Sequence, residues 1–513
     1  MSRSCSNIYS IRDDAVYVLN PYFRVRNEQD HILVFGCQDL GHWRLHRSYG
    51  VVLALCNGEH TVEDIARLTR PLVSLEDDGE SLILARQNVK KILYHMSHAK
   101  AGARDGLPNQ NNAFPVSTAI VQKSEFDIKF QGISVSKIEY DARSFLPKDA
   151  TQVGNPPFQV AQGISPTTLT YHLTSECATN CKYCYLNRRS ITPMPLERVL
   201  ELIDEAAHIG VCAIDCAGGD VLCYPHFFDV LARIKQHKFL PFLLSTKAHI
   251  TEKIAQELSR YREVIWRLQY SIDTDDKTIA NYLVEVPNFP DRAFTSIKNA
   301  LDAGLPVSVK AVITPYNILT IPRLYRKLKA IGVKIINLAT YSRSGYHHTD
   351  DLFCNNESFQ WLQREIETLN KEFPKDDVDI HNGRPTFEIA PFESRKEAWK
   401  KRSFCPAGHT SMMICADGKV VPCEQMPETD EYFCGDVSYQ SIMEVWNGDR
   451  LKNMTHGVSR EKFKGTECYD CDEREECHYI MGYCIRDLAL FFGNIYQPPL
   501  NCYKCSLPFV RQI

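Results

Sequence analysis

Apolar positions in the middle of the chain follow two alternating patterns. Between residues 166 and 345, short apolar runs alternate with longer segments whose apolar residues recur at helical spacing. The predicted strands are Thr167–Leu173, Val211–Cys216, Pro241–Ser245, Val264–Ser271, Pro306–Ile313 and Lys334–Ala339. The predicted helices between them are Leu196–Ile209, Pro225–Lys235, Thr251–Tyr261 and Ala293–Ala303. This alternation favours a parallel sheet curved into a barrel or partial barrel, with functional residues at the carboxyl ends of the strands.

The pattern in residues 12–100 is different. Residues 22–29 and 31–37 have the composition of two short strands, and Ser48–Cys56 and Ser81–His98 have the spacing of helices. Between them, the sequence from Thr61 to Asp64 forms a capping box that opens another helix. Two strands and three short helices predict a small winged-helix unit. Residues 101–165 are rich in turn residues and are expected to be a connector, in which 133–146 could add a strand.

Length, charge and cysteine content then limit the class of protein. At about 150 residues per domain, 513 residues correspond to roughly three to four domains. The net charge of −4 carries no basic excess for binding nucleic acid. No apolar run approaches the ~18 residues of a membrane helix and no secretory signal is visible, so we expect a cytoplasmic protein without a membrane segment. In a reducing compartment, 20 cysteines favour metal ligation over disulfides.

Three of these cysteines lie on one loop directly after the first predicted strand of the sheet. Cys177, Cys181 and Cys184 have the spacing CxxxCxxC, and three thiolates can hold three irons of a 4Fe–4S cube. The fourth iron then stays open to nitrogen and oxygen ligands, and half a zinc ribbon is the alternative. The motif resembles the radical S-adenosylmethionine (SAM) superfamily. That resemblance implies that the open iron binds SAM, that SAM is cleaved to a 5′-deoxyadenosyl radical, and that Tyr183 packs near the adenine.

Further matches to that superfamily follow at the ends of the next strands. The resemblance implies that these positions contact SAM or the substrate, and the residues concerned are Gly218, Gly219, Asp220, Ser245, Gln269 and Ser271. Two departures stand out, because Asp220 replaces the usual Glu and Lys247 replaces an Asn. For Asp273 two roles stay open: a catalytic general base, as in the related sulfatase maturases, or a hydrogen-bond acceptor for the ribose.

The C-terminal stretch contains ten of the 20 cysteines, between Cys405 and Cys505. Their spacing resembles the seven-cysteine SPASM domain, which binds two auxiliary 4Fe–4S clusters, although the gap from Cys477 to Cys484 is three residues longer than the usual pattern. The resemblance implies that the first cluster is held by Cys405, Cys415, Cys423 and Cys484, with Cys434 as another candidate for the fourth ligand. It implies that the second is held by Cys468, Cys471, Cys477 and Cys502, with Cys505 as a substitute for Cys502. Zinc is the alternative.

The N-terminal pattern resembles the PqqD-like domain of peptide-modifying enzymes, which binds a leader peptide as an extra strand against its third helix. A DNA-binding winged helix is the alternative. The predicted organisation is therefore a leader-binding domain (12–100), a connector (101–165), a partial (β/α)6 TIM-like radical SAM barrel (166–345), a bridge (346–400) and a SPASM domain (401–513), which we expect to depend on metal because it has little apolar core.

This combination resembles the maturases of ribosomally made peptides. It implies an oxidoreductase that uses SAM and three 4Fe–4S clusters, one that binds SAM and two auxiliary, to form a thioether, carbon–carbon or ether crosslink in a precursor peptide. It also implies an electron donor such as flavodoxin or ferredoxin. The alternatives are a radical SAM maturase of a folded protein partner, and a zinc-bearing winged-helix regulator.

Overall fold

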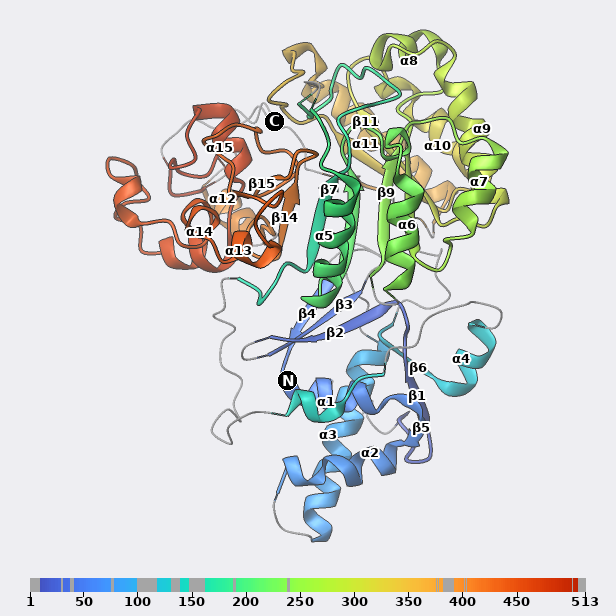
Figure 1. Cartoon of the computed structure of the whole chain (residues 1–513), viewed down its shortest axis with the longest axis vertical. Coiled ribbons are helices and arrows are strands. Elements are labelled where there is room, and N and C mark those ends of the chain that lie inside the picture. The colour runs from blue at the N-terminus through green and yellow to red at the C-terminus, as the bar shows by residue number, and fades with distance from the viewer. Residues whose placement is uncertain are drawn as a thin grey trace. The chain divides into compact units, whose positions relative to one another are not determined.

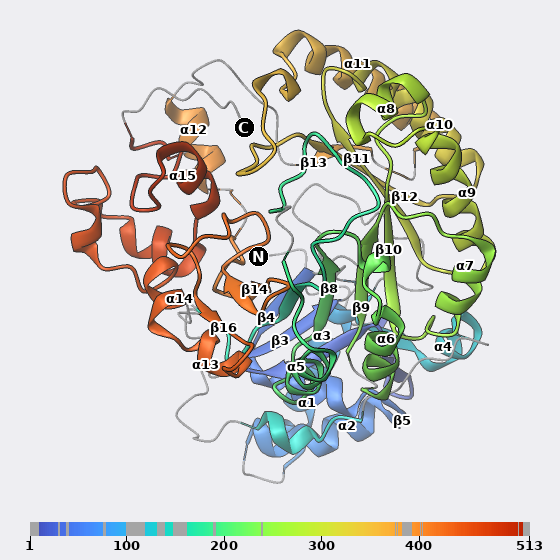
Figure 2. The same cartoon turned by 45° about the horizontal axis from the view of Figure 1, so that its top comes forward.

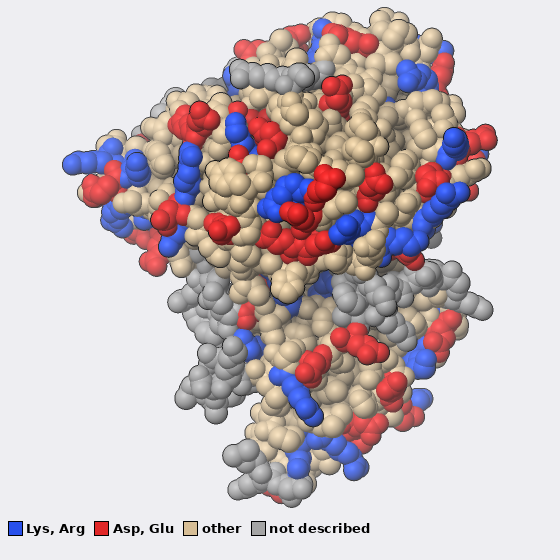
Figure 3. Space-filling model, viewed as in Figure 1, with Lys and Arg blue, Asp and Glu red and all other residues tan. Residues whose placement is uncertain are grey.

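The computed structural model places the chain in two compact units, residues 1–159 and 160–513 (Figure 1). The residues that the structure describes are 10–28, 31–36, 41–74, 78–98, 118–130, 139–146, 162–187, 191–237, 240–374, 376, 378–381, 392–400, 402, 404–500 and 502–505. Within these ranges, no helix has both the length and the apolar composition needed to cross a membrane. Acidic and basic side chains are interspersed on the face shown in Figure 3.

The first unit combines two three-stranded sheets with helices. One sheet has the order β2-β3-β4 and the other β5-β1-β6, and all their pairings are antiparallel. The strands are β1 (Val16–Leu19), β2 (Phe23–Asn27), β3 (Ile32–Gly36), β4 (Gly41–Leu45), β5 (Asn57–Thr61) and β6 (Ile120–Gln122). The helices are α1 (Arg47–Leu55), α2 (Val62–Thr69), α3 (Gly79–His98) and α4 (Lys123–Lys129).

The predicted helices of this unit are confirmed, and so are its two predicted strands, which correspond to β2 and β3. Helix α2 begins at a capping box in which Thr61 accepts a hydrogen bond from the backbone N–H of Asp64 and the Asp64 carboxylate accepts one from Thr61. The prediction of only two strands was wrong, because β1 and β6 have only four and three residues, and β4 (GHWRL) and β5 (NGEHT) contain glycine and few apolar residues. The proposed strand over 133–146 is wrong where it is described, since Ala142–Phe145 is a 3-10 turn, and residues 133–138 lie outside the described residues.

The predicted connector contributes to the core of the first unit. Strand β6 pairs with β1, with Val121 opposite Val18. Ala119, Ile120 and Phe145 are buried in the same apolar cluster as residues of α1, α2 and α3. The described segments 118–130 and 139–146 are therefore part of the N-terminal fold rather than a spacer.

The second unit contains six parallel strands that neighbour one another in chain order, β7 to β12. They are β7 (Thr168–His172), β8 (Ala213–Ala217), β9 (Phe242–Thr246), β10 (Ile265–Ser271), β11 (Val307–Ile313) and β12 (Ile335–Thr340). The helices between them are α5 (Leu196–His208), α6 (Phe227–Gln236), α7 (Glu252–Ser259), α8 (Lys277–Val284), α9 (Phe289–Asp302) and α10 (Ile321–Ala330). All six predicted strands and all four predicted helices are confirmed.

Side chains on these strands alternate between two environments. On β10, Leu268 and Tyr270 are fully buried, whereas Arg267, Gln269 and Ser271 keep partial exposure. The helices lie along the outer side of the strands (Figure 2) and share the apolar cluster with the buried positions. Because successive side chains of a strand point to opposite faces, the partly exposed positions form a second face that the helices do not cover.

The C-terminal stretch continues the same sheet. Strand β14 (Ser411–Ile414) pairs parallel with β7, and β15 (Lys419–Val421) and β16 (Gly435–Asp436) extend that edge, while β13 (Ile380–His381) adds to the opposite edge. The remaining helices are α11 (Asn356–Glu372), α12 (Phe392–Lys400), α13 (Ile442–Trp446), α14 (Asp449–Met454) and α15 (Ile485–Phe492). Met413, Val420 and Trp446 belong to the main apolar cluster, so the expectation that this stretch has little apolar core was wrong.

Candidate functional site

The loop of Cys177, Cys181 and Cys184 follows β7 at its carboxyl end. The Thr179 hydroxyl lies 3.5 Å from the Cys177 sulfur and 3.3 Å from the Cys181 sulfur. The loop backbone is held by α8, because the N–H of Asn180 donates to the carbonyl of Val284 at 3.0 Å. Burial raises the pKa of Cys177, because the charged thiolate is less stable away from water.

The described residues contain no group of three metal-ligating side chains close enough to hold a single metal ion. A 4Fe–4S cube separates its cysteine ligands more widely, since each thiolate binds a different iron. Three thiols on one loop, partly buried and backed by a hydroxyl, fit three corners of such a cube.

Gly218 and Gly219 bring the end of β8 against the cysteine loop. Gly218 has a φ of +104°, and a Cβ there would lie 2.7 Å from the Cβ of His172. A Cβ on Gly219 would overlap the carbonyl of Glu176. The N–H of Gly219 donates to the carbonyl of Thr174 at 3.0 Å, so these glycines first serve a close backbone contact within the protein.

Asp220, the residue that replaces the family's Glu, is 1% exposed. Its carboxylate accepts four hydrogen bonds, from the Thr246 hydroxyl (2.7 Å) and from the backbone N–H groups of Lys247 (2.7 Å), Ala248 (2.9 Å) and Leu222 (3.1 Å). Burial raises the pKa of Asp220, and these hydrogen bonds oppose the rise. Since a carboxylate has about four acceptor positions, this one is used fully to join the loop after β8 to the end of β9.

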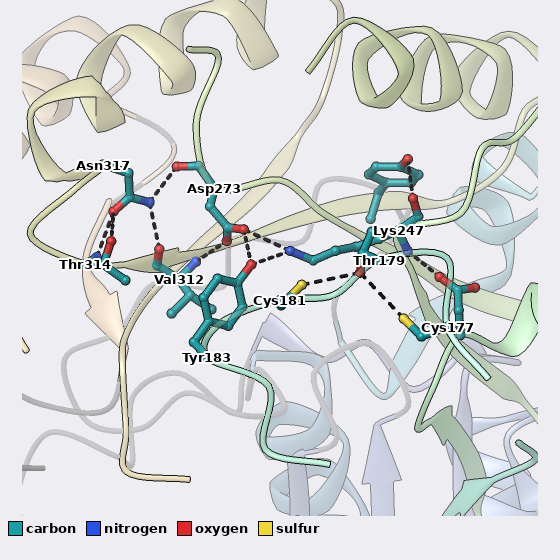
Figure 4. A network of polar contacts seen from close by, with 11 residues as sticks. Cys177, Thr179, Cys181, Tyr183, Lys247, Asp273, Val312, Thr314 and Asn317 are labelled. Atoms are coloured by element: carbon teal, nitrogen blue, oxygen red, sulfur yellow. Dashed lines mark hydrogen bonds and ion pairs between the residues drawn. The ribbon is translucent and has the colours of Figure 1, made fainter. Parts of the chain in front are cut away.

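Lys247, Asp273 and Tyr183 form a buried polar cluster beside the cysteine loop (Figure 4). The Lys247 ammonium lies 2.9 Å from the Asp273 carboxylate, and their side chains are 12% and 2% exposed. The Tyr183 hydroxyl donates to Asp273 and accepts from Lys247. Burial would lower the pKa of Lys247, but the charge of Asp273 and the Cys181 thiol outweigh it, so that pKa is raised.

Asp273 is fixed from a second strand as well. Its other carboxylate oxygen accepts the N–H of Val312 at 2.8 Å, and its backbone carbonyl accepts from the Asn317 side chain at 2.7 Å. Asn317 in turn accepts from the N–H of Thr314 at 2.7 Å. The carboxylate of this residue is therefore tied to β11 and its backbone carbonyl to the loop after β11 (Figure 4). Its carboxylate is the counter-ion of a lysine, an arrangement that neither of the two predicted roles anticipated.

The partly exposed face of the sheet, which we call the polar face, holds the other predicted SAM-contacting residues. The Gln269 amide donates to the Ser245 hydroxyl at 3.0 Å, and Ser271 follows two positions later on the same face. Two positions before Gln269 on β10, Arg267 forms an ion pair with Asp215 of β8 at 2.9 Å. Buried atoms of this pair, Arg267 Nε and Asp215 Oδ1, have no hydrogen-bond partner among the described residues. Such groups are available to a polar ligand or to water.

The C-terminal domain contributes Glu424 to this face. Its carboxylate accepts a hydrogen bond from the Tyr185 hydroxyl at 3.4 Å. Burial raises the pKa of Glu424, and the charge of Lys310 opposes the rise. Glu424, Arg267 and Lys310 carried no motif, so sequence reasoning missed them as site residues. The alternation of polar and apolar positions along the predicted strands was the available signal.

Cys405, Cys423 and Cys484, three predicted ligands of the first auxiliary cluster, interact electrostatically with one another. The long gap before Cys484 is taken up by a π-helical turn, Glu475–Met481, which ends at Gly482 with a φ of +64°. The N–H of Cys405 donates to the carbonyl of Met481 at 2.9 Å, so the end of the π-helical turn lies next to Cys405. The extra residues therefore change the local helix and still leave Cys484 beside Cys405.

Two cysteines remain candidates for the fourth ligand. Cys415 lies in the turn between β14 and β15, where its N–H donates to the carbonyl of Lys419 at 2.7 Å. Its thiol interacts with Cys434, and Cys434 interacts in turn with Cys423. Both are buried. The choice between them stays a prediction.

The predicted second auxiliary site contains five cysteines that interact with one another: Cys468, Cys471, Cys477, Cys502 and Cys505. A hydrogen bond from Cys505 lowers the pKa of Cys502 to about 7. Trp399 and Tyr503 pack in the same buried cluster. A 4Fe–4S cube takes four thiolates, so the site holds one thiol more than it needs.

Comparisons with known proteins agree with this arrangement. Residues 171–328 match the radical SAM superfamily, and residues 405–472 match SPASM, an iron–sulfur cluster-binding domain. The PqqA peptide cyclase of Granulibacter bethesdensis is 22% identical over 321 residues, which cover 60% of this chain and 80% of that protein. The subtilosin biosynthesis protein AlbA of Bacillus subtilis is 22% identical over 285 residues, 55% of this chain and 60% of that protein.

A solved structure, Streptococcus suis SuiB bound to its precursor peptide SuiA, covers 92% of this chain and 96% of its own, with a TM-score of 0.58 and 15% identity. At that identity the likeness concerns the fold. The two matched domains coincide with the parts of the chain that carry the CxxxCxxC loop and the first C-terminal cysteines. The protein is therefore an enzyme with a radical SAM domain followed by an iron–sulfur SPASM domain.

Proposed function

We propose that this enzyme modifies a ribosomally synthesised precursor peptide by forming a crosslink in its core segment. The observation that carries the proposal is the position of Cys177, Cys181 and Cys184 at the carboxyl end of β7, beside the polar face and within the matched radical SAM domain. The named activities of relatives support the substrate class, because PqqA peptide cyclase and AlbA both act in peptide maturation by their names.

The chain's residues divide the work as follows. The three loop cysteines would hold a 4Fe–4S cluster, and this cluster together with SAM would supply the radical chemistry that acts on the peptide. Ser245, Gln269 and Ser271 line the polar face next to this loop and orient SAM. The lower part of that face, with Arg267 and Asp215, receives the core peptide and holds the reacting carbon in place.

The first unit is proposed to bind the leader peptide. In the sheet β2-β3-β4, strand β4 pairs with β3 on one side, and no described strand covers its other edge. An extended leader could add there through backbone hydrogen bonds, as in the PqqD-like domains that this unit resembles.

The C-terminal cysteines are proposed to hold two auxiliary clusters. Closing a crosslink from a carbon radical releases one electron. The auxiliary clusters would accept this electron and pass it to an external flavodoxin or ferredoxin. A thioether, a carbon–carbon bond or an ether would each fit this scheme.

The first test is the iron, sulfide and zinc content of protein purified without oxygen, compared with the triple variant Cys177→Ala/Cys181→Ala/Cys184→Ala. We expect about twelve irons per chain in the wild type and about eight in the variant, from four irons per cluster. The variant should also lose the cleavage of SAM to 5′-deoxyadenosine. Zinc without iron would overturn the proposal.

The second test concerns the substrate. The enzyme is co-expressed with a peptide encoded by a neighbouring short reading frame that has Cys, Trp or Tyr in its C-terminal half. We expect a mass loss of about two hydrogens, from the stoichiometry of one crosslink, in the wild type and none with the triple variant. If the peptide binds but keeps its mass, no crosslink has formed. The enzyme could then still be a radical enzyme, but this peptide would not be its substrate.

A further inference from the structure

The buried cluster of Lys247, Asp273 and Tyr183 lies beside the loop of Cys177 and Cys181 (Figure 4). The Lys247 ammonium is 4.9 Å from the centre of the Tyr183 ring and 5.7 Å from that of Phe289. It interacts electrostatically with the thiols of Cys181 and Cys177. A fixed cation at this place acts on whatever charge those thiols carry.

The cluster also reaches the cysteine loop through a hydrogen bond. The Thr179 hydroxyl of that loop lies 3.5 Å from the Cys177 sulfur and 3.3 Å from the Cys181 sulfur. Tyr183 belongs to the same loop, and its hydroxyl donates to Asp273 and accepts from Lys247. Lys247 occupies a lone pair of the same oxygen and limits how the hydroxyl can turn.

These contacts concern the properties that set the reduction potential of an iron–sulfur cluster, namely nearby net charge and hydrogen bonds to the sulfurs. Reduction adds a negative charge to the cluster. A lysine nearby favours the reduced form, and an aspartate nearby disfavours it. Here the two are paired at 2.9 Å and nearly buried, so their opposing effects act together in a place of weak solvent screening.

We propose that Lys247 and Asp273 are positioning residues that set the reduction potential of the cluster held by Cys177, Cys181 and Cys184, through their own charges and through the hydroxyl of Tyr183. This rests on the proposed function, because it requires a cluster on that loop. The positive charge of Lys247 is matched by Asp273, and each charge has a distinct effect on the cluster.

The test is an EPR-monitored redox titration of the anaerobically purified holoenzyme, performed without SAM. Lys247→Met is expected to lower the midpoint potential and Asp273→Asn to raise it. Each shift should change the ratio of reduced to oxidised cluster at a fixed potential by about tenfold, or about 59 mV for one electron. In the double variant Lys247→Met/Asp273→Asn, which leaves no unpaired buried charge, the two shifts should largely cancel.

A matched control is the ion pair of Lys329 and Asp376, which is 2.8 Å long and comparably buried, with side chains 19% and 14% exposed. It lies at α10 and beyond α11, on elements that do not carry the cysteine loop. Lys329→Met should leave the midpoint potential unchanged. Lys247→Arg keeps the positive charge, so its midpoint potential should stay close to that of the wild type.

The outcomes separate the two proposals. Iron content is measured first, and a wild type without the loop cluster would refute the proposed function. If all variants hold full iron but Lys247→Met and Asp273→Asn keep the wild-type potential, or shift it in the same direction, the tuning role is wrong. If one single variant loses its cluster, the other single variant still decides, because Lys247→Met and Asp273→Asn are each expected to shift the potential in a stated direction.

Discussion

Replacing Asp220 tests how the loops around the site are held together. Its carboxylate is buried and accepts three backbone N–H groups and the Thr246 hydroxyl. In Asp220→Asn, the amide nitrogen can replace the oxygen that faces Thr246, whose hydroxyl can turn and accept. The N–H of Leu222 then loses its acceptor. Asp220→Ala removes the acceptor of the Leu222 and Lys247 N–H groups, whereas the N–H of Ala248 keeps the Thr246 hydroxyl as an acceptor at 3.0 Å.

The size of each effect follows from the unpaired donors. A buried N–H without a partner costs about 1–3 kcal/mol. Because burial raises the pKa of Asp220, the ionised carboxylate is itself penalised in the folded state, and a neutral amide avoids that penalty. We therefore expect Asp220→Asn to lower the free energy of unfolding by about 1–3 kcal/mol, and Asp220→Ala by about 2–6 kcal/mol, for the two unpaired donors of Leu222 and Lys247.

The assay is urea unfolding of the anaerobic holoenzyme, followed by circular dichroism with comparison of midpoints at an unchanged slope. The matched control is Asp276→Asn, because Asp276 also caps backbone N–H groups, of Thr278 and Ile279, but at an exposed position. Water can replace its carboxylate, so we expect a loss of about 1 kcal/mol or less. Equal stability of wild type, Asp220→Asn and Asp220→Ala would refute the reasoning.

Three further predictions concern other parts of the second unit. Gly219→Ala places a Cβ on the carbonyl of Glu176, so it should displace the cysteine loop and reduce the iron bound there; full iron content would contradict this. Burial raises the pKa of Glu428 to about 7, so between its unfolded value near 4.5 and pH 7 the folded state binds the extra proton. The free energy of unfolding should then fall as pH rises from 5 to 7, and Glu428→Gln should flatten this slope in urea titrations. Because five thiols share the second auxiliary site, Cys505→Ala should keep that cluster's iron and EPR signal if Cys502 is the ligand; their loss would assign Cys505 instead.

The strands of the parallel sheet could be predicted closely because their apolar runs are continuous. Val307–Ile313, for example, is buried on both sides at most positions and differs from the predicted Pro306–Ile313 by one residue. Helix α8 was missed, although its eight residues equal the length of helix α7, which was predicted. Its capping residue, Asp276, was the available signal.

The site was predictable where a motif marked it and not where it depends on contacts distant in sequence. Lys247 was visible as a departure from the family, but its partner Asp273 is 26 residues away and meets it because β9 and β10 are neighbouring parallel strands. The hydrogen bond from Tyr185 to Glu424 spans 239 residues. Such pairs become visible only when the strand order is known, and no local pattern encodes them.

The strand order also explains how two cysteine-rich regions come to lie at one edge of the sheet. Strand β14 is parallel to β7, with Ile414 opposite Tyr171, so both strands end in the same direction at the same edge of the sheet. The loop of Cys177 begins shortly after β7, and Cys415 follows β14 directly. From that turn the chain passes through β15 to Cys423 and then to Glu424, which reaches the polar face. The C-terminal domain is thus built onto the sheet, and it bounds the surface on which we propose the peptide reacts.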